Sequence, residues 1–223
     1  MTREAGLTVL EEHRQRLDPL CAKGFYAHGS LALGGYHHGI SDIDLVVLLD
    51  HELTDAERSL IGDSHRKAGR LLAAAYVHDA TDPEGEHPTW THGWHGDRRV
   101  SLITRAELHQ AHGEEWPEIP DLPGAVAVEV RRAWSRTPPS TWLRTEYVDL
   151  ALTSVARARL TQRSGQLTSK DHAIDQLQDL GVPARLADAV AARRQGREAL
   201  PHNRFSRALS TWRTVQRLLQ RVS

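Results

Sequence analysis

Four leucines near the N-terminus recur at helical spacing, with charged residues between them: Leu7, Leu10, Leu17 and Leu20. This pattern predicts an amphipathic helix over residues 2–20. Two short runs of strand-forming residues follow, at 25–28 and 43–49. The second run is almost entirely apolar, which is typical of a strand with both faces buried, so we expect it at the centre of a sheet.

The same alternation of helix and strand continues to about residue 105. Thr54-Asp55-Ala56-Glu57 has the pattern of a capping box, which predicts the start of a helix over 55–75. Beyond it the sequence predicts three segments: a strand over 74–79, a loop over 80–97 that is interrupted by glycine and proline, and a strand over 100–104. Together these elements indicate a small unit built on a mixed sheet.

The hydrophobic pattern of the second half is helical throughout. The first of its predicted helices lies within 140–163. The next runs from a cap at Thr168 or Ser169 to Gly181, and another has Pro183 in its first turn. The last helix has an apolar stripe that we expect to face the core, made of Phe205, Leu209, Trp212, Val215, Leu219 and Val222.

The two halves meet in a stretch rich in carboxylates and proline, at 113–123, which is typical of a domain boundary. The sequence therefore predicts an α+β fold with two domains. The first, over 1–112, has a mixed sheet with helices. The second, over 124–223, is an all-α helical bundle.

Composition and charge narrow the possible partners. The 28 Lys and Arg residues and the 29 Asp and Glu residues leave a net charge of −1, which argues against binding to nucleic acid. No apolar run approaches the roughly 18 residues that span a bilayer, and the N-terminus lacks the apolar segment of a signal peptide. We therefore expect a soluble, cytoplasmic protein with no membrane partner. The single cysteine, Cys21, is expected to be a small buried side chain.

The segment between His28 and Val47 carries the strongest indication of chemistry. Gly29-Ser30 follows one predicted strand, and Asp42-Ile43-Asp44 begins the next. Because side chains alternate along a strand, the two aspartates project from the same side, about 7 Å apart. Two such carboxylates can share Mg²⁺, which also binds substrate phosphates. Gly29 lets a phosphate approach the backbone, and the Ser30 hydroxyl and the following amides can donate to it.

Each of these features alone is commonly a solvated strand end or a plain turn, but their combination at this spacing favours a site for a metal and a nucleoside triphosphate. The segment resembles the nucleotidyltransferase superfamily related to DNA polymerase β, whose signature is Gly-Ser, a spacer of about ten residues, and Asp-x-Asp on the next strand. Residues 152–157 and 161–171 are similar to the helical domain of the aminoglycoside adenylyltransferases that modify streptomycin and spectinomycin. The resemblance covers most of the chain.

This resemblance implies an enzyme that binds ATP and Mg²⁺ in the sheet domain and transfers AMP to an antibiotic hydroxyl, with release of pyrophosphate. It implies that Asp42 and Asp44 are catalytic and hold the metal. It also implies a set of residues that bind the nucleotide, of which the last two come from the helical domain: Gly29, Ser30, Ser41, Arg157 and Lys170.

Superfamily members often place a third acidic residue on the strand after Asp-x-Asp. Asp79, at the end of the strand predicted over 74–79, is the candidate catalytic base in this sequence. His78 is an alternative, since histidine can accept a proton near neutral pH. A base located elsewhere, or none, stays open.

The helix predicted from Ser140 suggests how an acceptor is bound. Trp142, Glu146 and Asp149 fall on one face at steps of three and four. An aromatic plate beside two carboxylates suits a small, cationic, aminoglycoside-like acceptor, and Trp94 in the preceding loop is a further candidate. The alternative is an exposed amphipathic face with ordinary ion pairs. The alternative function is a degenerate or regulatory nucleotidyltransferase-fold protein that binds nucleotide or a partner without transfer.

Overall fold

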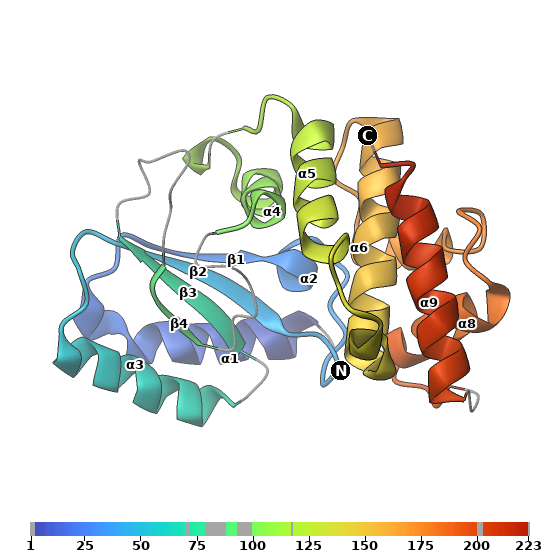
Figure 1. Cartoon of the computed structure of the whole chain (residues 1–223). Coiled ribbons are helices and arrows are strands. Elements are labelled where there is room, and N and C mark those ends of the chain that lie inside the picture. The colour runs from blue at the N-terminus through green and yellow to red at the C-terminus, as the bar shows by residue number, and fades with distance from the viewer. Residues whose placement is uncertain are drawn as a thin grey trace. The chain divides into compact units, whose positions relative to one another are not determined.

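The computed structural model describes residues 3–69, 72–78, 88–92, 100–116, 118–199 and 203–222, with the backbone alone for 88–92. Contacts between Cα atoms divide the chain into two compact units, Met1–Glu118 and Ile119–Ser223. This division lies inside the stretch at 113–123 that the sequence assigns to a linker. Figure 1 shows the strands in the first unit and helices alone in the second. The α+β class predicted from the sequence is confirmed.

The first unit is built on a four-stranded mixed sheet with strands in chain order: β1 (Gly24–His28), β2 (Ile43–Leu49), β3 (Leu72–His78) and β4 (Pro88–His92). β1 and β2 are antiparallel, β2 and β3 are parallel, and β3 and β4 are antiparallel. β2 lies between two neighbours and its residues pack on both faces of the sheet, which confirms its predicted central position.

Helices cover both faces of this sheet (Figure 1), with these bounds: α1 (Arg3–Arg16), η1 (Asp18–Leu20), α2 (Gly29–Ala32), α3 (Asp55–Ala68), α4 (Leu102–His112) and η2 (Gly113–Glu115). Ile43, Leu45 and Val47 pack on one face with residues of α1 and α3. Val46 packs on the opposite face with Leu108 of α4. Since side chains alternate along β2, Asp44 lies on the α4 side of the sheet.

A buried polar network lies on the α1 and α3 face of the sheet. The Tyr76 hydroxyl is 3.0 Å from Nε2 of His13 and 3.1 Å from Nε2 of His65. Oγ of Ser64 is 2.8 Å from Nδ1 of His13. Because buried polar groups need hydrogen-bond partners, this network ties α1 and α3 to β3 at a fixed position.

Four predictions for this unit are wrong: three concern elements and one concerns the burial of a side chain. The expected loop over 80–97 contains β4, and the expected strand over 100–104 is the start of α4, whose N–H group at Thr104 donates to the Ser101 hydroxyl (3.1 Å). α3 ends at Ala68 rather than near 75, because Gly69 turns the chain at φ +86°. Cys21 is exposed, in a left-handed conformation that closes η1.

The capping box at the start of α3 is present as predicted. The Glu57 N–H donates to the Thr54 hydroxyl (3.3 Å), and the Thr54 N–H donates to the Glu57 carboxylate (2.8 Å). We expect Thr54→Ala to lower the free energy of unfolding by about 1 kcal/mol, the usual loss on removing an N-cap. Urea denaturation measures this, with the exposed Ser59→Ala in the same helix as control. An equal midpoint for the two variants would contradict the prediction.

The same capping box sets a pH dependence. Hydrogen bonds from the Thr54 hydroxyl, then the Thr54 amide and His51, lower the pKa of Glu57 from 4.5 to about 2. A carboxyl whose pKa is lowered by folding stabilises the fold above its unfolded pKa. The contribution of Glu57 is therefore present above about pH 4.5 and is lost as the pH falls towards 2.

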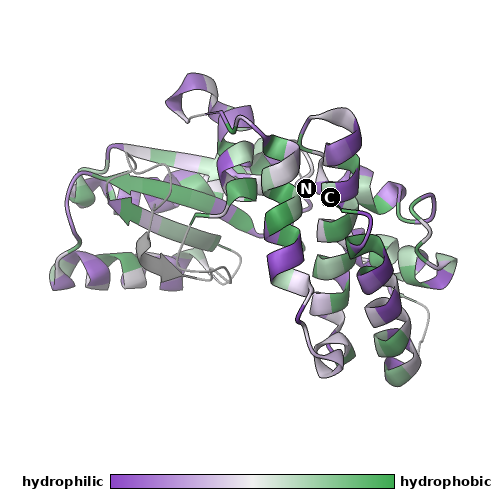
Figure 2. Ribbon diagram, turned by 45° about the horizontal axis from the view of Figure 1, so that its top comes forward, coloured by the Kyte–Doolittle hydropathy of each residue, from purple (hydrophilic) through white to green (hydrophobic). Residues whose placement is uncertain are grey.

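The second unit is helical in all its described elements: α5 (Leu122–Trp134), η3 (Pro139–Leu143), α6 (Thr145–Ser164), α7 (Lys170–Asp175), α8 (Ala184–Arg194) and α9 (Arg204–Leu219). α6 contacts α5, α7 and α9. The apolar residues of α6 form a fully buried stripe, with Val148, Ala151, Leu152, Val155 and Ala158 at 0% exposure. Figure 2 shows hydrophobic residues along the central strands of the sheet, and helices that carry both hydrophobic and hydrophilic residues. No described helix is both long and apolar enough to cross a membrane.

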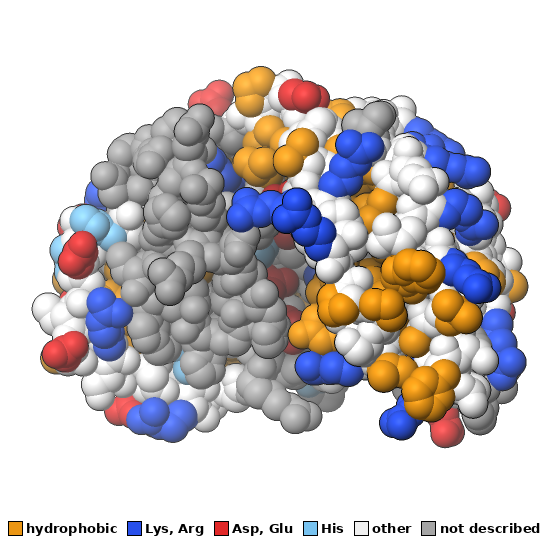
Figure 3. All heavy atoms as spheres, in the orientation of Figure 1, with side chains coloured by type: hydrophobic (Ala, Val, Ile, Leu, Met, Phe, Trp, Pro, Cys, Tyr) orange, Lys and Arg blue, Asp and Glu red, His pale blue; other side chains and the backbone are white. Residues whose placement is uncertain are grey.

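Two helical predictions need correction. The helix expected from Ser140 begins at Thr145, after the separate turn η3. In α9 the predicted stripe reaches the core only in its second half, because Phe205 is 60% exposed and Leu209 is 47% exposed. The face that packs there instead consists of small residues, Ala208 and Thr211. Figure 3 shows apolar side chains at the surface of the helical unit.

Candidate active site

The Gly-Ser turn and the Asp-x-Asp strand meet at one end of the sheet. β1 ends at His28, which lies opposite Asp44 in the register, and α2 begins at Gly29 with φ +60°. A Cβ atom on Gly29 would lie 2.5 Å from Oδ2 of Asp44. Only glycine therefore fits, because both the left-handed backbone and the carboxylate exclude a side chain. The Asp44 carboxylate lies directly against the backbone of the Gly-Ser turn.

The junction of the Gly-Ser turn with the start of β2 has three further polar residues beside it: Asp42, Ser30 and Ser41. Asp42 is exposed and Asp44 is partly buried, while Ile43 between them lies in the core on the other side of the sheet. The two carboxylates thus project away from the core together. Ser30 is buried in α2. Ser41 is also buried, and its hydroxyl accepts a hydrogen bond from the His37 N–H (3.0 Å), so it closes the turn that leads to Asp42.

α4 holds the end of β1 through two histidines. Nδ1 of His28 lies 3.0 Å from Oε2 of Glu107, and both side chains are almost completely buried. Nε2 of His112 donates to the Ala27 carbonyl (2.8 Å). His28 and Asp44 are directly opposite each other and share the α4 side of the sheet. The His28–Glu107 pair therefore fixes the residue before Gly29.

Sequence reasoning missed the role of Glu107, because it assigned the start of α4 to a strand. The signal that could have found it is the serine cap. Ser101 is followed three residues later by Thr104. Leu102 and Ala106 are four residues apart and Leu108 and Ala111 are three apart, which is helical rather than alternating spacing.

The register excludes His78 as a base at this junction. In the parallel pair, Asp44 lies opposite Ala73 and Leu49 lies opposite His78. Five residues of strand separate Ala73 from His78, a distance of about 17 Å. His78 is therefore at the other end of the sheet from the two aspartates. Asp79 and Trp94 lie outside the described residues. The backbone of β4 returns towards the aspartates, with His92 opposite Ala74.

A family model described as a nucleotidyltransferase domain matches residues 8–116, which include the Gly-Ser turn and both aspartates. Residues 8–116 are a nucleotidyltransferase domain. Among solved structures, spectinomycin adenyltransferase AAD(9) from Enterococcus faecialis, crystallised with ATP and spectinomycin, is similar to this nucleotidyltransferase with a TM-score of 0.69 and 14% identity. The match covers 100% of this chain and 99% of that chain, and it shows a shared fold. No curated protein sequence matches.

This domain makes the chain an enzyme that transfers a nucleotide. Within the described residues of the nucleotidyltransferase, no group of three or more His, Cys, Asp or Glu side chains could hold a metal. Asp42 and Asp44 nevertheless fit Mg²⁺, because that ion is usually held by one or two carboxylates together with substrate phosphates and water.

Arg157 and Lys170 lie in one region of the helical unit of the nucleotidyltransferase. Arg157 is 5% exposed and its Nε donates to the Thr168 carbonyl (2.7 Å). Lys170 follows two residues later as the first residue of α7, which is capped by the Ser169 hydroxyl. Arg157 thus holds the segment that leads to Lys170, and this hydrogen bond of Arg157 has a structural role.

The three residues expected to bind the acceptor do not form one open face. Trp142 is fully buried in η3 against Trp134, with ring centroids 5.6 Å apart, so it is not an exposed aromatic plate. Glu146 is exposed and paired with Arg144 (2.6 Å). The Asp149 carboxylate accepts a hydrogen bond from Nε of Arg193 (2.7 Å). Burial raises the pKa of Asp149, and this effect exceeds the lowering by Arg193. Both carboxylates therefore already have cationic partners.

The His28–Glu107 pair gives a prediction about stability. We expect Glu107→Leu to lower the free energy of unfolding by about 1–3 kcal/mol, because the buried His28 side chain loses a hydrogen-bond partner. Glu107→Gln keeps an acceptor and should cost less. Urea denaturation checks both, with the exposed Glu114→Gln as control. If the leucine and glutamine variants lost equal stability, the hydrogen bond would not be the reason.

Proposed function

We propose that this nucleotidyltransferase transfers AMP from ATP to a hydroxyl group of a small, aminoglycoside-like acceptor and releases pyrophosphate. The observation that carries the proposal is the Asp44 carboxylate packed against the left-handed Gly29 backbone, with Asp42 beside it. The full-length likeness to an adenyltransferase crystallised with ATP and spectinomycin supports the nucleotide and the class of acceptor.

The residues of the junction have different roles in this reaction. The acceptor oxygen attacks the α-phosphorus, the bond to the bridging oxygen of pyrophosphate breaks, and the acceptor proton passes to a base. Asp42 and Asp44 would hold Mg²⁺, which neutralises the phosphates and stabilises charge on the α-phosphoryl group. Gly29 brings backbone close to the phosphates, and the Ser30 hydroxyl can donate to them. The catalytic base has to lie at the Asp44 end of the sheet. His78 lies at the other end, so it cannot be this base.

We also propose that Lys170 contacts the triphosphate of ATP, with Arg157 beside it. A lysine that makes a charge-assisted hydrogen bond to phosphate contributes about 1.5–3 kcal/mol. We expect Lys170→Ala to weaken MgATP binding by roughly ten- to a hundredfold. Isothermal titration measures this, with the exposed Lys67→Ala as the matched lysine control. An unaltered dissociation constant for Lys170→Ala would remove it from the site.

The test of the function is direct. The protein is incubated with MgATP and a panel that includes spectinomycin and streptomycin, and pyrophosphate and product masses are measured. Transfer gives pyrophosphate in step with an acceptor whose mass rises by one AMP group. Replacing ATP with GTP tests which nucleobase the enzyme accepts in its nucleotide substrate.

The second candidate is a nucleotidyltransferase-fold protein that binds nucleotide without transfer. It predicts tight MgATP binding with no pyrophosphate for any acceptor. That result would overturn the proposed transfer.

A further inference from the structure

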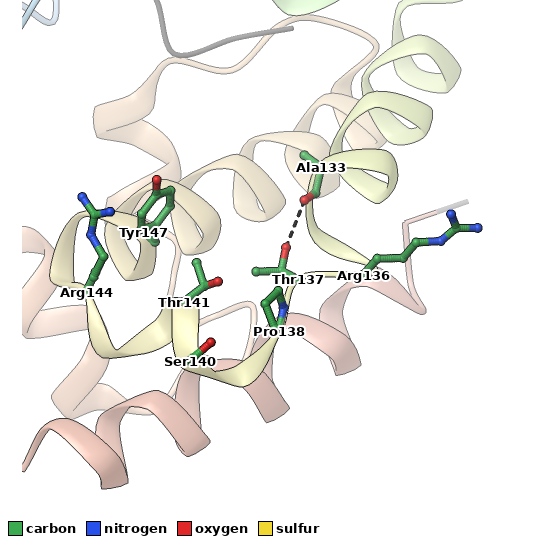
Figure 4. A pocket seen from close by; sticks show the side chains of 8 residues that line it. All are labelled: Ala133, Arg136, Thr137, Pro138, Ser140, Thr141, Arg144 and Tyr147. Atoms are coloured by element: carbon green, nitrogen blue, oxygen red, sulfur yellow. Dashed lines mark hydrogen bonds between the residues drawn. The ribbon is translucent and has the colours of Figure 1, made fainter.

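The helical unit contains an open pocket of about 600 Å³ between the end of α5, η3 and the start of α6 (Figure 4). This size suits a small molecule of about the volume of a sugar or nucleotide. Its lining residues are Ala133, Arg136, Thr137, Pro138, Ser140, Thr141, Arg144 and Tyr147. Arg144 and Tyr147 lie at one end, Arg136 lies at the other, and the hydroxyl groups lie between them.

The lining has two guanidinium groups and no carboxylate. Glu146, the nearest acid in the chain, is engaged by Arg144 through both Nε (2.8 Å) and Nη2 (2.6 Å). Its pKa is lowered by a hydrogen bond from its own amide first and by Arg144 next, so it stays ionised and paired. Glu146 therefore lies outside the lining and offsets part of the charge of Arg144, while Arg136 adds a second positive charge to the lining.

Arg144 is held in place but keeps donors for a ligand. Its guanidinium lies 4.7 Å from the centroid of the Tyr147 ring, which fixes its plane, and it uses only two of its five N–H groups on Glu146. Nearby, Arg207 donates to the Leu143 carbonyl (2.8 Å) and adds positive charge beside η3.

The hydroxyl groups between the two arginines supply neutral donors. The Thr137 hydroxyl donates to the Ala133 carbonyl (3.1 Å), as the dashed line in Figure 4 marks. Ser140 and Thr141 show no side-chain hydrogen bond within the part of the chain that the structure describes. Two free hydroxyls beside a fixed guanidinium form a donor set that matches a phosphate group, which accepts several hydrogen bonds and carries negative charge.

We propose that this pocket binds the phosphate group of a small hydroxylated phosphomonoester, with the phosphate at the Arg144 end and the hydroxylated part towards Arg136. The inference concerns the helical unit alone and goes beyond the proposed adenylyl transfer. Apolar walls at Ala133 and Pro138 contact the carbon skeleton, and the lining has no carboxylate that would favour a cation.

Isothermal titration of the full chain without ATP tests this inference. Glucose 6-phosphate is the probe, and glucose, inorganic phosphate and spectinomycin are the comparison ligands. We expect glucose 6-phosphate to bind at least tenfold more tightly than glucose or spectinomycin, and more tightly than inorganic phosphate. Equal binding of glucose, or tighter binding of spectinomycin, would overturn the assignment.

Variants locate the ligand in the pocket. Arg144→Gln should weaken glucose 6-phosphate binding at least tenfold, and Arg144→Lys should have an intermediate effect because it keeps the charge without the planar fork. Arg136→Gln is a second variant at an exposed position, and the exposed Arg131→Gln on α5, outside the lining, is the control. Unchanged binding in both Arg144→Gln and Arg136→Gln would contradict the proposal.

The phosphate probe could also enter the nucleotide site, and two measurements separate these outcomes. Binding in the pocket should persist in Asp44→Asn and should not be displaced by MgATP. Displacement by MgATP would place the probe in the sheet unit and overturn the inference. Failure of adenylyl transfer with intact glucose 6-phosphate binding would instead overturn only the proposed function.

Discussion

Asp44→Asn should reduce adenylyl transfer by about a hundredfold or more while the protein remains folded. The substitution keeps the side-chain volume but removes a charge that would hold Mg²⁺ against the phosphates. Loss of one preorganised electrostatic group at a reacting centre typically costs about 10²–10³ in rate. Asp44 is also the carboxylate that contacts the Gly29 backbone, so its position is determined more strictly than that of the exposed Asp42. Steady-state release of pyrophosphate measures the effect.

The control for this prediction lies on the same strand. Asp50 follows the other end of β2 and is exposed, and it pairs with the neighbouring His51 (2.6 Å). Asp50→Asn should leave transfer within about twofold of the native rate, because surface ion pairs contribute little. Wild-type turnover in Asp44→Asn, with Mg²⁺ present, would rule out the junction as the active site.

Gly29→Ala should impair both stability and transfer. A non-glycine residue in the left-handed conformation costs about 1–2 kcal/mol, and the new Cβ would lie 2.5 Å from the Asp44 carboxylate. That carboxylate has to move, so we expect transfer to fall at least tenfold, beyond what the loss of stability explains. Thermal unfolding and turnover below the unfolding range separate the two effects.

Gly34 provides a matched comparison in the same segment. It too has a positive φ, +85°, but a Cβ there would meet nothing within 4 Å. Gly34→Ala should therefore cost about 1 kcal/mol of stability from backbone strain alone and leave transfer unchanged. If both alanine variants lost the same activity, the contact between Gly29 and Asp44 would not be responsible.

The sequence predicted best those features that depend on local composition. The apolar run over 45–49 in β2 indicates burial on both faces, and the Gly-Ser and Asp-x-Asp spacing indicates the junction, because both patterns are set by the local sequence. β4 was missed because it starts at Pro88, and proline is tolerated only at an edge strand or the first residue of a strand. The composition of residues 80–97 therefore indicated a loop rather than a strand.

Other features depend on contacts between distant segments, which periodicity does not specify. His78 ends a strand after the Asp-x-Asp strand, but its distance from Asp44 depends on whether the two strands run in parallel. Likewise, the spacing of Phe205 and Leu209 places them on one helix face. It does not show how much of that face neighbouring elements cover, and both side chains are exposed. Trp142 is a core residue because a partner ring, Trp134, lies eight residues earlier on another helix.

The exposed thiol of Cys21 has a practical consequence for studying motion between the units. Because the chain contains one cysteine and it is accessible, a maleimide dye attaches at a single known position in the sheet unit without mutagenesis. A second cysteine at Ser135, which is exposed at the end of α5, would allow a donor and an acceptor dye to be placed on the two units. Energy transfer between these dyes would then report, molecule by molecule, whether the units approach each other when nucleotide is added.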